Sequence, residues 1–193
     1  MRHCKRHLFA ALIALLLLAG HDAFAQRVTG VNLSQSSIKF VSKQMNVPVE
    51  GKFAKFALQL TFDAAKPSEG HVLVELELAS IDTGSEEANE EVKGKGWFDV
   101  QRFPTARFVS SSVRSSGPGR YEASGKLTIK GRTKNVVVPF AFKTAEHLAV
   151  FDGAFALKRL DYGIGQGVWS DTDTVADEVE IKFHITANAE TAK

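Results

Sequence analysis

Few side chains of this sequence have the type and spacing that metal or acid–base chemistry needs. Three histidines follow the first 25 residues, His71, His147 and His184, and no two of them have the spacing of metal ligands. Each is predicted to be a surface or edge-strand residue. The sequence therefore predicts no metal site.

Two short motifs match ligand-binding loops only in part. Residues 171–174, Asp-Thr-Asp-Thr, begin like a calcium loop, but Val175 and Ala176 stand where a third oxygen ligand and a turn glycine belong. The glycine-rich segment 163–167 follows a predicted strand but precedes no helix, as a dinucleotide-binding loop would. The chain also lacks a Gly-x-Ser-x-Gly elbow and, after its fourth residue, any cysteine. We therefore predict no cofactor and no catalytic residue.

Arg159 is the one charged candidate for ligand binding. It shares strand parity with Phe151, Phe155 and Leu157, which puts its guanidinium at the end of an inward-facing row. Two interpretations stay open: the guanidinium holds a phosphate or carboxylate of a ligand, or it pairs with Asp161 or another nearby carboxylate and closes that end of the fold.

The N-terminus has the three parts of a secretory signal peptide. Three basic side chains precede an apolar run over residues 8–20, and Ala23-Phe24-Ala25 supplies small residues for cleavage. The run is shorter than the roughly 20 residues that a membrane-spanning helix needs, so an uncleaved anchor is the weaker alternative. We expect cleavage after Ala25, which divides the chain into a signal peptide, 1–25, and one exported domain, 26–193, in the periplasm.

Removal of the signal peptide leaves a neutral chain without cysteine. Of 24 Lys and Arg and 22 Asp and Glu side chains, three basic ones and one acidic one precede Gln26, so 21 of each remain. The single cysteine, Cys4, is lost as well. Without a basic cluster there is no electrostatic footprint for nucleic acid. Without disulfides, the hydrophobic core alone must hold the domain.

Apolar residues recur at every second position in eight segments, which is the period of a strand with one buried face. Turns rich in Gly, Pro and Ser separate many of these segments, which are 38–40, 56–62, 72–78, 106–108, 121–129, 136–142, 151–157 and 179–185. Short strands joined by short turns are typical of antiparallel sandwiches and barrels. We predict an all-β fold.

One segment, residues 82–93, lacks this alternation. It opens with cap-type residues, carries its acids early and ends in lysine, the charge order that a helix dipole favours. We expect a single short α-helix on the outside of the sheet or across one end of it. Its acidic residues are interpreted as a solvated face rather than a metal site.

The segment 95–108 is both aromatic and charged. Trp97 and Phe98 follow the predicted helix, and Pro104 excludes helix just before the next strand. We expect the aromatic side chains to fold under the helix and to plug or line one end of the barrel, with direct ligand contact as the minority alternative. Three charged residues are expected to face water: Asp99, Arg102 and Arg107.

Several motifs together resemble the YceI-like family in order and spacing. They are FVSKQMNVPVEGKF (40–53), ASIDTG (79–84), WFDVQRFPTARF (97–108), GKLTIKGRTKNV (125–136) and DEVEIKFHITA (177–187). The resemblance implies an elongated, eight-stranded antiparallel lipocalin-like barrel that holds a polyisoprenoid or another long-chain amphiphile. Many members have a histidine where this chain has Gln44, followed here by a turn over 45–50, so no head-group contact is transferred to that position.

An eight-stranded barrel encloses either a filled core or room for one small ligand. The inward-facing rows are almost free of polar side chains, so a ligand must be mostly hydrocarbon, with a driving force of about 0.8 kcal/mol per buried methylene. The predicted ligand-binding residues are Ile38, Phe40, Phe56, Leu58, Leu60, Val74, Leu76, Trp97, Phe98, Phe108, Leu127, Val138, Phe140, Phe155, Arg159, Ile181 and Phe183.

The leading functional hypothesis is a non-catalytic periplasmic carrier or store for a polyisoprenoid or similar lipid. Two alternatives stay open. An enzyme acting on such a lipid would need polar groups in the lumen, and an accessory protein would dock a membrane protein through its outer face, where Val137, Pro139 and Ala141 are apolar. The sequence does not determine the oligomeric state, and a dimer is one option.

Overall fold

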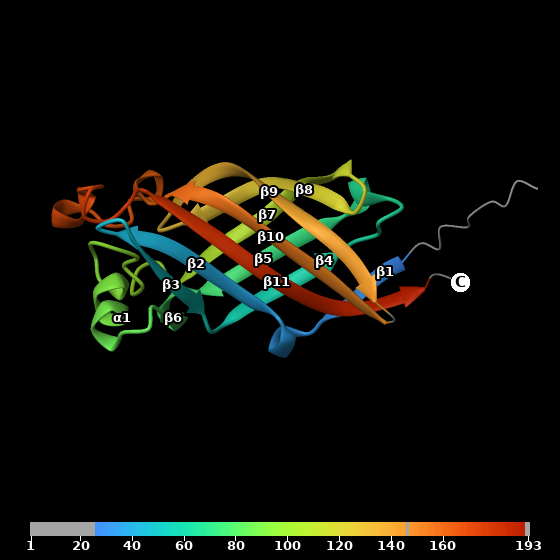
Figure 1. Ribbon diagram of the computed structural model, residues 1–193, viewed down its shortest axis with the longest axis horizontal. Coiled ribbons are helices and arrows are strands. Elements are labelled where there is room, and N and C mark those ends of the chain that lie inside the picture. Colours follow the sequence, from blue (N-terminus) through green and yellow to red (C-terminus); the bar gives the residue numbers. More distant parts are fainter. Residues whose placement is uncertain (1–25, 146, 192–193) are drawn as a thin grey trace, which may run out of the picture.

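The chain folds into one antiparallel sheet of eleven strands that curls into a barrel (Figure 1). The computed structural model describes residues 26–145 and 147–191, so the predicted signal peptide lies outside the described part. The strands are β1 (Gln26–Val31), β2 (Ser37–Gln44), β3 (Val47–Phe53), β4 (Phe56–Thr61), β5 (His71–Glu77), β6 (Ile81–Asp82), β7 (Thr105–Gly117), β8 (Arg120–Ile129), β9 (Arg132–Ala145), β10 (Leu148–Lys158) and β11 (Glu178–Thr191). The predicted all-β, antiparallel fold is confirmed.

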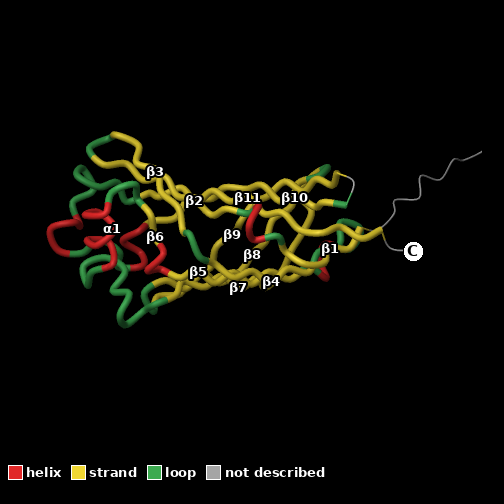
Figure 2. Tube along the Cα trace, turned by 90° about the horizontal axis from the view of Figure 1, so that it is seen from below, coloured by secondary structure: helices red, strands yellow, loops and turns green. Residues whose placement is uncertain are grey.

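The two edges of the sheet meet near the ends of the barrel. The strand order is β4-β5-β7-β8-β9-β10-β11-β2-β3-β6, with β1 beside β11. At one end, the Val28 N–H of β1 donates to the carbonyl oxygen of Phe62, just after β4, at 3.1 Å. At the other end, the edge strand β6, which pairs with β3 through Ile81 and Phe53, is joined to β5 near the opposite edge by the short turn Leu78–Ser80. Figure 2 shows the resulting two walls, with β2, β10 and β11 facing β4, β5 and β7.

All eight predicted strands are present, and three further strands, β1, β3 and β6, raise the total to eleven. The turn expected over 45–50 is only two residues long. Met45 and Asn46 both have positive φ values, 47° and 64°, in a tight hairpin turn, and β3 begins directly after them. The sequence did not indicate this strand because it contains Pro48. Proline lacks an N–H and occurs in sheets mainly in edge strands, at strand starts or in bulges.

The single α-helix, α1 (Glu86–Lys93), lies across the end of the barrel that is opposite β1 (Figure 1). The Ser85 hydroxyl caps it by accepting from the Ala88 N–H. The helix begins later than expected because Asp82 belongs to β6. None of the helices in the described ranges is both long and apolar enough to cross a membrane.

The end of the barrel near β1 is filled by aromatic side chains. Phe62 is 1% exposed and contacts four other rings edge-on, with centroid separations of 4.9 to 5.8 Å: Tyr121, Phe140, Phe142 and Phe151. Such edge-to-face contacts are favourable beyond the apolar area that they bury. The core is therefore solid at this end, and the hollow part of the barrel begins beyond it.

Candidate functional site

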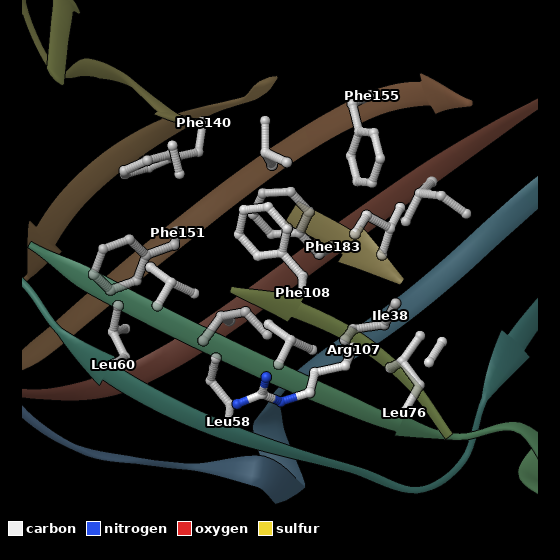
Figure 3. Close-up of a pocket in the computed structure, with 18 of the residues that line it drawn as sticks. Ile38, Leu58, Leu60, Leu76, Arg107, Phe108, Phe140, Phe151, Phe155 and Phe183 are labelled. Atoms are coloured by element: carbon white, nitrogen blue, oxygen red, sulfur yellow. The ribbon is translucent and has the colours of Figure 1, made fainter. Parts of the chain in front are cut away.

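A cavity with a volume of about 130 Å³, here called the central cavity, lies inside the barrel (Figure 3). Strands β2, β4, β5 and β7 to β11 contribute to its wall, because every second side chain of each points inward. Its lining residues are Ile38, Leu58, Leu60, Phe62, Val72, Val74, Leu76, Ala106, Arg107, Phe108, Ala123, Leu127, Val138, Phe140, Phe151, Phe155, Ile181, Phe183 and Ile185. The wall is thus aliphatic and aromatic, apart from Arg107, whose side chain is half-exposed and pairs with Glu75 at 3.2 Å.

A second cavity of about 140 Å³, the helix-end cavity, lies toward α1. It is lined by Phe40, Ser42, Phe53, Leu76, Leu78, Ile81, Trp97, Phe98, Ala106, Leu127, Ile129, Phe155, Leu157, Arg159, Ile164, Val179 and Ile181. The cavities adjoin, because Leu76, Ala106, Leu127, Phe155 and Ile181 belong to both walls. Each is far larger than the roughly 10–15 Å³ that one water molecule needs.

The structure brings nearly all the predicted ligand-binding residues together around these cavities. Every one of them lines at least one cavity except Phe56, which packs against the core beside them. Their contact with a ligand stays a prediction. The arrangement follows from strand parity, since residues of one parity share a face of the sheet.

Three apolar wall residues could not be found by extending the predicted strand rows. Phe53 and Ile81 come from the short strands β3 and β6, and Ile164 comes from a loop. For Phe53 a signal existed, because Val47, Val49 and Phe53 keep the alternation across Pro48. Ile81 and Ile164 had no periodic signal.

Glycines opposite aromatic residues shape the wall. Gly153 of β10 faces Phe183 of β11 in register, and a side chain on Gly153 would collide with that ring and with the Pro139 carbonyl oxygen. Gly51 of β3 stands in the same relation to Phe40 of β2. Because glycine has no side chain, both rings can lie close to the neighbouring backbone. Curved sheets commonly pair glycine with an aromatic residue in this way.

Arg159 closes the helix-end cavity through hydrogen bonds to the backbone. It is 2% exposed, and all five of its guanidinium N–H groups have carbonyl partners. Nε donates to Ala176 at 3.0 Å, Nη1 to Ile164 and Gly165 at 2.9 and 3.0 Å, and Nη2 to Trp169 and Val175, both at 2.7 Å. Burial lowers the pKa of Arg159, an effect that the charge of Asp177 partly offsets.

The interpretation that Arg159 closes this end of the fold agrees with the structure, but its hydrogen-bond partners are backbone carbonyls rather than a carboxylate. Asp161 is half-exposed and lies 3.9 Å from Lys134 instead, so it is not the partner. A head group would find no free N–H on this guanidinium, because the carbonyl groups of the loop that follows it have taken all five. Arg159 is predicted correctly as inward-facing, but it organises the loop rather than offering donors to a ligand.

The glycine-rich segment 163–167 packs against the guanidinium of Arg159 and accepts hydrogen bonds from it. Gly163 and Gly165 have φ values of 68° and 71°, and a side chain on Gly165 would collide with Arg159 Nη1. Glycine is required there by the left-handed backbone and by the close approach. The sequence showed only that this segment is not a dinucleotide-binding loop. The structure shows that Gly165 makes room for the Arg159 side chain.

Trp97 and Phe98 line the helix-end cavity, as expected for a segment that closes the barrel below α1. The backbone turns sharply here, because the N–H groups of Phe98 and Val100 return to the carbonyls of Val92 and Lys93. The expectation that Asp99 faces water is wrong. Its side chain is 8% exposed and its φ is 52°, while Arg102 and Arg107 are exposed as expected.

The remaining polar motifs have local partners. Asp171 accepts from the Asp173 N–H at 3.0 Å and from the Thr174 hydroxyl at 2.9 Å, and these bonds lower its pKa. His184 lies 2.6 Å from Asp152 on the outer face of the barrel. Within residues 26–145 and 147–191, no group of three or more His, Cys, Asp or Glu side chains could hold a metal ion.

Fold and cavity together define a lipocalin-like β-barrel protein with an apolar interior. The chain belongs to the YceI family, because the model of the YceI-like domain matches residues 30–187. It is 34% identical over 178 residues to a UPF0312 protein of Ectopseudomonas mendocina, an alignment that covers 89% of this chain and 93% of that protein.

Two solved structures show the same fold. BcnA of Burkholderia cenocepacia is 45% identical, with a TM-score of 0.80 over 81% of this chain and 99% of that one. A polyisoprenoid-binding domain from Saccharophagus degradans, implicated in plant cell wall breakdown, is 14% identical, with a TM-score of 0.64 over 86% of this chain and 99% of that one.

Proposed function

We propose that this protein binds one long-chain lipid, a polyisoprenoid or a comparable amphiphile, inside the barrel and carries or stores it without catalysis. The observation that carries the proposal is the pair of adjoining cavities, whose walls are built almost entirely from aliphatic and aromatic side chains. Burying ten methylene groups there gives on the order of 8 kcal/mol before the costs of ordering the chain. The polar residues in the two walls are few: Arg159 is fully hydrogen-bonded, Arg107 pairs with Glu75, and Ser42 stands alone, so no catalytic group of residues is assembled among the described wall residues.

One comparison motivates the proposed chemical class of ligand. The Saccharophagus degradans domain with the same fold is a polyisoprenoid-binding domain, although its low identity supports only the shared architecture. The predicted signal peptide supports action in the periplasm, where a carrier shields a lipid chain from water. An accessory role in docking a membrane protein rests on the outward side of β9, where Val137 is 52% exposed.

A chain-length series tests lipid binding in the barrel. The mature chain, stripped of bound lipid, is titrated with straight-chain alcohols from octanol to hexadecanol, and each affinity is measured by competition with a fluorescent fatty alcohol. We expect affinity to rise roughly fourfold with each methylene until the cavities are full, and then to level off. An affinity independent of chain length would contradict burial of the chain, and a protein that binds none of the series would favour the accessory role.

A further inference from the structure

The indole nitrogen of Trp97 is a buried donor without a partner. In the part of the chain that the structure describes, it is the one buried side-chain nitrogen or oxygen that lacks a hydrogen bond. Buried polar groups are almost always paired, because an unpaired one loses its bond to water and gains nothing. An unpaired donor in the wall of a ligand cavity therefore needs an explanation.

The neighbours of Trp97 leave this N–H free. Its ring packs against Trp169 at a centroid distance of 5.6 Å, and the guanidinium carbon of Arg159 lies 5.7 Å from the ring centroid. The Cζ3 corner of the indole lies beside Gly165, and Nε1 is at the opposite end of the ring system. The N–H of Trp169, by contrast, donates to Glu91 at 2.7 Å. Of two adjacent indoles, only the one in the cavity wall lacks an acceptor.

The other charged groups at this end do not favour an anionic ligand. Arg159 lines the same cavity, but its five N–H groups are taken by backbone carbonyls. The adjacent helix α1 carries four glutamates in eight residues, Glu86, Glu87, Glu90 and Glu91. A phosphate buried here would need several charged donors to replace its water, and Trp97 supplies one neutral donor.

We propose that Trp97 Nε1 donates a hydrogen bond to a neutral oxygen, a hydroxyl, carbonyl or ether, at the polar end of the bound lipid. This inference rests on the proposed lipid-binding function and adds the orientation and head-group class of the ligand. The hydrocarbon chain extends into the central cavity, and the oxygen lies in the helix-end cavity. The site selects neutral head groups over phosphorylated ones.

Three probes with one isoprenoid chain test the proposal: farnesol, farnesyl phosphate and farnesene, which end in a hydroxyl, a phosphate and a hydrocarbon. Dissociation constants are measured by equilibrium dialysis with the mature chain. One neutral hydrogen bond predicts that farnesol binds about 2- to 10-fold more tightly than farnesene, while farnesyl phosphate binds no more tightly than farnesene. In Trp97→Phe the advantage of farnesol is lost and the affinity for farnesene is retained. In the matched control Trp169→Phe, the advantage of farnesol remains.

A second measurement follows the Trp97 indole N–H by NMR in the protein without substitutions. The indole ¹⁵N–¹H resonance of Trp97 is expected to move on addition of farnesol much further than on addition of farnesene. Ser42 also lines the helix-end cavity, so Ser42→Ala tests the alternative that its hydroxyl binds the lipid oxygen. Any of four results would overturn the assignment to Trp97. They are equal binding of farnesol and farnesene, a farnesol advantage that survives Trp97→Phe, one that is lost only in Ser42→Ala, and tightest binding of farnesyl phosphate. If none of the three probes binds, the lipid-binding function itself fails.

Discussion

Arg159 stabilises the helix end of the barrel by tying the loop over 163–177 to the end of β10. Its five hydrogen bonds reach carbonyls that lie from five to seventeen residues away in the sequence. A charged donor makes each of these bonds stronger than a neutral one. The residue therefore acts on stability, and through the cavity wall only indirectly on binding.

Replacing Arg159 with methionine is expected to lower the free energy of unfolding by at least about 3 kcal/mol, because five carbonyls lose their donor, three of them in buried and two in part-buried hydrogen bonds. The free energy of unfolding of Arg159→Lys should lie between those of the unmodified protein and Arg159→Met, since an ammonium group has three donors. Urea unfolding followed by circular dichroism measures both. The exposed Arg120→Met is the control and should change stability by less than about 0.5 kcal/mol. A stable Arg159→Met protein that loses only anionic ligands would contradict the structural role.

The sequence could place Arg159 but could not name its partners. Parity with Phe155 and Leu157 predicts an inward-facing side chain, and Arg159 is indeed buried, in the 3-10 turn Arg159–Tyr162 that directly follows β10. The partners are backbone atoms of an irregular loop, whose position depends on the fold and not on residue type. The buried Asp99 was missed for a similar reason, since a left-handed turn rather than strand parity sets its direction.

The hairpin of β2 and β3 is an element with a strained turn. Met45 has a φ of 47°, a left-handed conformation that costs a side chain such as methionine about 1 kcal/mol. Met45 is also 68% exposed, so it contributes little packing in return. The hairpin matters to the site, because Phe40 and Phe53 on its strands line the helix-end cavity.

Met45→Asn is expected to raise the free energy of unfolding by about 0.5–1 kcal/mol, because asparagine tolerates the left-handed region. Met45→Leu keeps the strain and is the matched control, with no expected gain. Thermal unfolding monitored by circular dichroism measures both variants. Equal stability of the two would show that the turn is not strained in the way described.

Alternation predicted the long elements because packing on one face of a sheet requires it. The eight predicted strands all carry that pattern, and the helix shows its cap and its charge order. Three strands escaped prediction: β1 follows directly on the predicted signal peptide, β6 spans only two residues, and β3 contains Pro48. Their positions follow from how the edges of the sheet meet, which is a property of the whole barrel.

At the scale of the molecule, the barrel is solid at the β1 end and hollow toward α1. Ala106 lies where the two cavities adjoin and belongs to both walls. Its small side chain leaves room that a larger residue would occupy. The length of ligand that fits therefore depends on this position.

Ala106→Leu is expected to weaken binding of hexadecanol by at least about tenfold, because the added methyl groups separate the two cavities. The free energy of unfolding should change by less than about 2 kcal/mol, since the larger side chain enters empty space. Ala156→Leu on the exposed side of β10 is the control and should bind normally. Unchanged affinity in Ala106→Leu would show that the ligand does not pass this point.

Native mass spectrometry of the mature protein, purified from its own host without detergent, tests the central claim most directly. We predict a complex of one protein with one lipid, and a mass difference on solvent extraction that equals a long-chain molecule. A protein that carries no lipid in its host, and whose native mass equals that of the bare chain, would contradict the account.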